Sequence, residues 1–177
     1  MRLIRLLKKY SAGYAAIETA EIRFDPAFRS ACEQNACGFY GACWMCPPDV
    51  GEIDALIARA KSYEHAIAFQ TVREIADSFD IDGMQHAARA HNRLISRIRR
   101  AAEKDDINCW LLGAGACGGC KTCAKKSGEP CRHPDRAVVS LEAAGVDVVA
   151  LAKQSGLPYM NGKNTVTYFG LILFHGK

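Results

Sequence analysis

Eight of the nine cysteines in this chain fall into two groups of four, and clustered thiols of this kind form disulfides or bind metals. The first set lies in residues 32–48 and comprises Cys32, Cys37, Cys43 and Cys46. The second set lies in residues 117–134 and comprises Cys117, Cys120, Cys123 and Cys131. Any interpretation has to account for both sets.

The second set begins with the pattern C-x₂-C-x₂-C, which is typical of iron–sulfur ligands. Three thiolates at this spacing can each bind a different iron of one cluster. Glycines at 115, 118 and 119 permit the tight, partly left-handed backbone that such a wrap needs. Cys131 follows after a longer gap and is the candidate fourth ligand. Structural zinc sites more often use two separated pairs of ligands, so this set favours a [4Fe-4S] cluster over zinc.

The first set is spaced less regularly, as Cys32-x₄-Cys37-x₅-Cys43-x₂-Cys46, and ends in Pro47-Pro48. A Cys-Pro ending also closes ferredoxin-type runs. Four irregularly spaced cysteines suit a Zn(Cys)₄ site as well, so zinc is a stronger rival here. Aromatic residues lie between the ligands, and they either shield a cluster from water or are ordinary core residues.

Composition places these cysteines in a folded protein within a reducing compartment. The 177 residues are 49% hydrophobic and 24% charged, as in a single folded domain spanning 1–177. No apolar stretch approaches the roughly 20 residues of a membrane span, and "MRLIRLLKKY" lacks the features of a signal peptide. We therefore expect a cytoplasmic protein, in which thiols stay reduced and disulfides are disfavoured. The net charge of +4 gives no reason to expect a nucleic-acid partner.

The elements that must position the two sets alternate between helices and strands. Strands are predicted at 14–18, 65–72, 108–114 and 164–174, and helices at 3–11, after Asp49, at 83–104 and from Ser140 to Gly156. This order predicts an α/β or α+β domain with about four strands and packed helices. Both cysteine loops follow a strand-like segment and precede a helix, so we expect them at one edge of the sheet.

Four segments carry a resemblance to a known family: "FDPAFRSAC", "CGFYGACWMCPP", the long block from "GAGACGGC" to "EAAGVDV", and the closing "NTVTYFGLIL". In these the chain resembles an uncharacterised prokaryotic family, mostly from anaerobes, of predicted metal-binding, cysteine-rich proteins of unknown function. The resemblance implies metal binding through the eight cysteines of the two sets. It implies no established reaction.

The sequence thus predicts an iron–sulfur protein with two [4Fe-4S] clusters that exchanges single electrons with a redox partner protein. One alternative is a small reductase or cofactor-activating subunit with one cluster at a substrate site. Another is a non-redox zinc module. Arg89, Arg93, Arg97 and Arg100 form a basic stripe that is either a solvated helix face or a docking surface for an acidic redox protein. Cys109 lies outside both sets and is predicted to be a small buried hydrophobe.

Overall fold

A five-stranded mixed sheet forms the centre of the computed structural model, which describes residues 2–176. Along the sheet the order is β1 (Gly13–Glu18), β2 (His65–Glu74), β5 (Thr165–Phe174), β3 (Cys109–Gly113) and β4 (Val139–Ser140). Neighbouring strands are antiparallel except β3 and β4, which are parallel. The fold is a single α+β domain, as expected, with five strands rather than about four.

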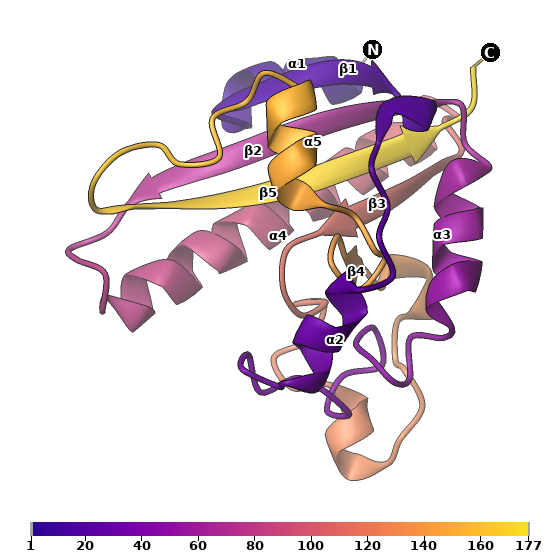
Figure 1. The fold of residues 1–177 in the computed structure, drawn as a ribbon, viewed down its shortest axis with the longest axis vertical. Helices are drawn as coiled ribbons and strands as arrows, with labels where there is room; N and C mark the ends of the chain where they lie inside the picture. The colour runs from indigo at the N-terminus through magenta and orange to yellow at the C-terminus, as the bar shows by residue number, and fades with distance from the viewer. Residues whose placement is uncertain (1, 177) are drawn as a thin grey trace.

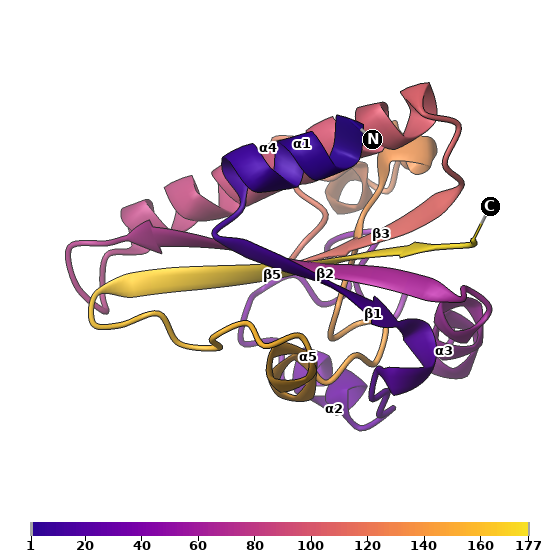
Figure 2. The same ribbon diagram turned by 90° about the horizontal axis from the view of Figure 1, so that it is seen from above.

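Helices cover both faces of the sheet (Figures 1 and 2). On one face α1 (Arg2–Tyr10) packs beside the long α4 (Ile81–Lys104). The other face carries α2 (Phe28–Glu33), α3 (Ile53–Lys61) and α5 (Val148–Gln154). No helix in the described residues is long and apolar enough to cross a membrane.

The two central strands are apolar on both faces because both faces are covered. On β5, Ile172 packs toward α1 and α4, whereas Leu171 and Leu173 pack into the second core with α3 and α5. All three side chains are fully buried. Burying one such side chain contributes about 1.5–3 kcal/mol, so these two layers hold the sheet that carries the cysteine loops.

Helix starts follow the expected capping chemistry at two positions. Asp80 accepts a hydrogen bond from the Gly83 amide at 2.8 Å and begins α4, while Asp147 accepts one from the Ala150 amide at 2.9 Å and begins α5. The predicted helix start at Ser140 was wrong, because Ser140 is the last residue of β4. Asp49 does not cap α3, whose N-cap is Glu52.

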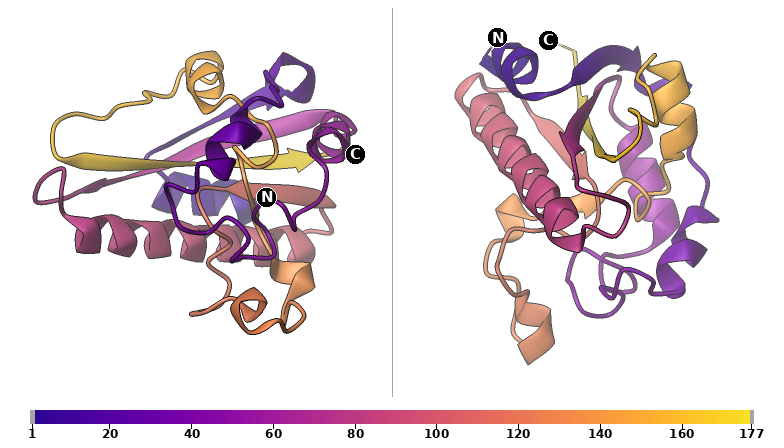
Figure 3. Two further views of the ribbon diagram at one scale, coloured as in Figure 1. Left: turned by 60° about the horizontal axis from the view of Figure 1, so that its bottom comes forward. Right: turned by 90° about the vertical axis from the view of Figure 1, so that its left-hand side faces the viewer.

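The topology brings both cysteine segments to the same end of the molecule. The second set follows β3, and the first set extends from α2 toward α3. In Figures 1 and 3 the loops of the two segments lie side by side below the sheet, near β4. The two loops lie together near the edge strand β4, as expected. The first set follows α2 rather than a strand, however, and the second set leads into β4 rather than a helix.

Candidate metal centre

The first set is held in a series of turns that bury two of its four sulfurs. Cys43 is 3% exposed and Cys46 is 9% exposed, whereas Cys32 is half-buried and Cys37 is exposed. The interaction with Cys43 raises the pKa of Cys46 most, burial raises it further, and the charges of Cys37 and Cys32 act in the same direction. The four thiols are therefore close enough to influence one another electrostatically.

Cys43 is the point at which the two sets meet. The Cys46 thiol has the largest effect on Cys43 and lowers its pKa, against the opposing effect of burial. The backbone N–H groups of Cys117 and Met45 and the Cys123 thiol also lower the pKa of Cys43. The Cys43 sulfur thus lies near two residues of the second set.

The second set is shaped by left-handed glycines and by the neighbouring α4. Gly115 and Gly118 have φ values of +68° and +64°, which glycine adopts without steric cost. A Cβ on Gly118 would lie only 2.2 Å from the Asn92 side chain of α4, so any other residue here would require Asn92 to move. The Cys117 sulfur accepts a hydrogen bond from the Val138 amide at 3.3 Å. The predicted left-handed wrap is confirmed at these two glycines.

Four residues hold the two loops together, and we call them the interloop latch. They are Trp44 and Asp49 from the first loop and Lys125 and Glu129 from the second. The Trp44 indole N–H donates to the Glu129 carbonyl at 2.9 Å. Lys125 forms an ion pair with Asp49, and its ammonium lies 4.3 Å from the centre of the Trp44 ring. Trp44 therefore joins the loops, a role that its position between two cysteines does not reveal.

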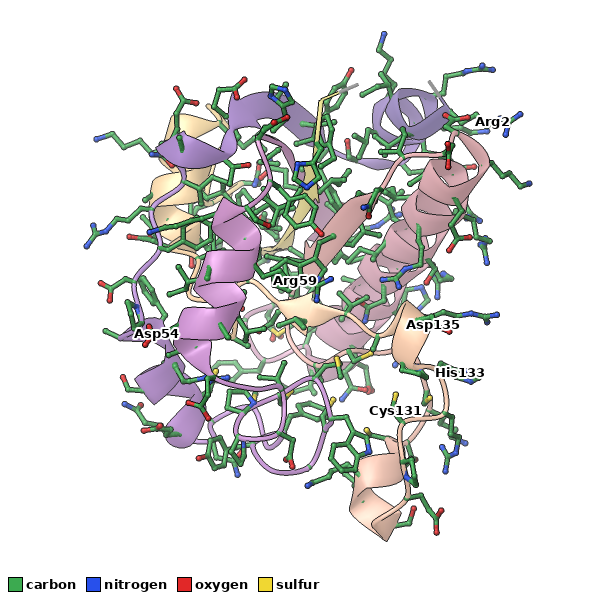
Figure 4. The ribbon with its side chains drawn as sticks, turned by 90° about the vertical axis from the view of Figure 1, so that its right-hand side faces the viewer. Arg2, Asp54, Arg59, Cys131, His133 and Asp135 are labelled. Carbon is green, nitrogen blue, oxygen red and sulfur yellow. The ribbon has the colours of Figure 1, made fainter. Side chains whose placement is uncertain are left out.

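The other cysteines, and His133 two residues after Cys131, differ in their exposure. Cys120, Cys123 and Cys131 are half-buried, and Cys131 lies among other sulfur atoms in Figure 4. His133 is exposed at the surface (Figure 4). Cys109 opens β3 and packs against the α1–α4 core, and burial raises the pKa of its thiol. It is half-buried rather than fully buried as predicted.

The donor chemistry of the two loops fits a thiophilic metal. All nine cysteines are free thiols, and sulfur donors select zinc, copper(I) or iron–sulfur clusters over hard cations. In residues 2–176 no three Cys, His, Asp or Glu side chains converge closely enough to hold one ion. The arrangement is thus a thiol-rich junction between two loops, with Cys43 at its centre.

Comparison with known proteins places the chain in a family. The family described as "Predicted metal-binding protein (DUF2284)" matches residues 15–174, which include both cysteine sets. The chain belongs to this family. No curated protein and no solved structure matches it. The resemblance seen in the cysteine-rich motifs is confirmed, and the family's description agrees with the thiol-rich donor set.

Proposed function

We propose that this member of the metal-binding family is an iron–sulfur protein that holds two [4Fe-4S] clusters and exchanges single electrons with a partner protein. The observation that supports the proposal most is that the two four-cysteine loops contact each other through the Trp44–Glu129 hydrogen bond and the Lys125–Asp49 ion pair, with Cys43 near the second set. The first set would hold one cluster and the second set the other. Such clusters supply one-electron redox chemistry, and their proximity would permit transfer from one to the other.

The protein's own groups are arranged to stabilise negative charge on sulfur. The backbone N–H of Val138 donates to the Cys117 sulfur, and the backbone N–H of Cys117 lowers the pKa of Cys43. Five cationic residues surround the second set: Lys121, Lys125, Lys126, Arg132 and Arg136. Hydrogen bonds and positive charge near a thiolate-ligated cluster raise its reduction potential. The proposal includes a cytoplasmic location, because these thiols must remain reduced.

A basic surface formed by α1 and α4 supports the proposal that the partner protein is acidic. The four arginines of the α4 stripe, Arg89, Arg93, Arg97 and Arg100, are exposed. Beside them α1 adds exposed Arg5, Lys8 and Lys9, and the two helices run next to each other in Figure 2. Electrostatic steering speeds the encounter of oppositely charged proteins and weakens with salt. Electron transfer to an acidic carrier should therefore slow as ionic strength rises.

The enzymatic alternative gains support from a cavity beside the cysteine loops. This cavity is lined by Ala114 and Gly115, which lead directly into the second set, and a small reductase would need such a site. An incompletely ligated cluster would favour this alternative. If a Cys131→Ser variant retains an intact second [4Fe-4S] cluster, Cys131 is not required as its fourth ligand. One iron would then be free to bind a substrate, as the enzymatic alternative requires.

Anaerobic purification followed by iron, sulfide and zinc analysis with EPR tests the proposal. We expect about eight irons and eight sulfides per chain, as two [4Fe-4S] clusters require, and reduced-cluster signals that broaden through mutual interaction. Cys43→Ser should disturb both clusters, whereas Cys109→Ser should leave the metal content unchanged. One zinc per set without sulfide would refute electron transfer and support the zinc module.

A further inference from the structure

A cavity of about 390 Å³ lies between the start of β5, the end of β3 and the segment that follows α5. This volume is at the lower end of the range of small-molecule sites. Leu141, Val148 and Phe169 supply apolar walls. Tyr159 stacks on Phe169 with ring centroids 6.1 Å apart. Two of its lining residues, Tyr159 and Met160, are 51% and 80% exposed, so they form its outer rim.

One acidic side chain and no basic side chain line this cavity. The acidic residue is Glu142, and no lysine, arginine or histidine lines the cavity. Within residues 2–176 no cation forms an ion pair with Glu142. A partly buried carboxylate without a counter-charge is costly, and here burial raises the pKa of Glu142.

Asn161 adds a second hydrogen-bond acceptor to the cavity. Its amide nitrogen donates to the Pro158 carbonyl at 3.1 Å and to the Thr167 hydroxyl at 2.9 Å. Both amide hydrogens are then in use, and its oxygen is left as an acceptor. The Ser140 hydroxyl and the backbone N–H of Glu142 lie near its carboxylate and partly offset the rise in its pKa caused by burial. Glu142 and Asn161 therefore both offer acceptor oxygens to a ligand in the cavity.

We propose that this cavity binds a small organic cation, with an ammonium or amidinium group at Glu142 and an apolar or aromatic body against Phe169 and Tyr159. The carboxylate supplies the counter-charge that the protein itself does not provide. Aromatic faces add a favourable interaction with the cation and with a flat ring. An anionic ligand would find no positive side chain among the lining residues.

The bound cation would lie beside both cysteine loops. Gly115 lines the cavity two residues before Cys117. Burial raises the pKa of the Cys32 thiol, and the charge of nearby Glu142 acts in the same direction. The inference rests on the cavity and its charge, and it holds whichever metal the cysteines bind.

Calorimetric titration of the full-length, anaerobically purified protein with benzylamine and benzyl alcohol tests the proposal. The two probes have nearly the same shape, and only the amine is charged at neutral pH. We expect benzylamine to bind at least tenfold more tightly than benzyl alcohol. We also expect Glu142→Gln, which keeps the shape of the side chain, to remove this preference. Equal affinity for the two probes, or no binding of benzylamine at millimolar concentration, overturns the proposal.

A second pair of variants keeps the test independent of the folding of Glu142→Gln. Val148 lines the cavity, whereas its neighbour Val149 does not line it and is 59% exposed. Val148→Trp should fill the cavity and abolish benzylamine binding, and Val149→Trp should leave it unchanged. If both variants bind benzylamine as the unmodified protein does, the amine binds elsewhere and the proposed site is wrong. Metal and sulfide analysis of the same samples reports separately on the iron–sulfur proposal.

Discussion

Replacing Lys125 by methionine removes the charged contact of the interloop latch. The variant keeps most of the aliphatic length, but it loses the ion pair with Asp49 and the cation–π contact with Trp44. The side chains of Lys125 and Asp49 are 25% and 17% exposed, so this pair is intermediate between surface and buried ion pairs. We expect a loss of about 1–2 kcal/mol from the ion pair and about 0.5–1 kcal/mol from the cation–π contact.

A total of roughly 2 kcal/mol corresponds to about a thirtyfold change in an equilibrium constant. The latch joins two surface loops, so its loss should raise the population of locally separated loops more than that of the unfolded chain. The assay is the rate at which anaerobically purified protein loses its bound metal to an excess of chelator. We expect Lys125→Met to release metal about ten- to thirtyfold faster, because the loops must separate to expose the buried Cys43.

Two comparisons make this prediction specific. Arg2→Met breaks an ion pair with Asp105 at the far end of α4, where the nitrogen–oxygen distance is 3.7 Å, and it should leave the release rate unchanged. Adding Asp49→Asn to Lys125→Met should cost little more, because the pair is already broken and an unpaired carboxylate is removed. If Lys125→Met and Arg2→Met release metal at the same rate, the latch does not control access to the cysteines.

Three further predictions concern the core and the site. Burial lowers the pKa of His91 from 6.5 to about 4, so the unfolded chain binds its proton more readily. Stability should therefore fall by up to about 3 kcal/mol as pH drops from 6.5 to 4, and urea unfolding of His91→Gln should lack this component. Gly170→Ala would place a Cβ 2.3 Å from the ring of the fully buried Phe69, and a loss of about 1–3 kcal/mol in urea unfolding is expected. Trp44→Phe keeps the ring but loses the indole bond to Glu129, so metal release should accelerate by about two- to tenfold, which an unchanged chelator assay would contradict.

Local sequence patterns identified the strands and helices that their own apolar spacing and end residues specify. The strands β2 and β5 are continuous apolar runs, and α4 has its apolar spacing together with an aspartate cap. Patterns failed where a distant contact overrides a local signal. Asp49 precedes a helix like a cap, yet it pairs with Lys125, which lies 76 residues away in the sequence. Ser140 also precedes a helix-like stretch, but it pairs with Gly113 of β3 and so belongs to the parallel strand β4.

The sequence by itself determined the chemistry of this protein: eight clustered thiols, glycines that allow a left-handed loop, and the family that the motifs indicate. The tertiary structure decided which of these groups meet. It inserts the C-terminal β5 between β2 and β3, brings Cys43 against the second set, and leaves Glu142 in a cavity without a counter-charge. Spacing along the chain fixes which residues share one turn or strand face, whereas contacts between distant segments follow from how the helices and the sheet bury their apolar faces together.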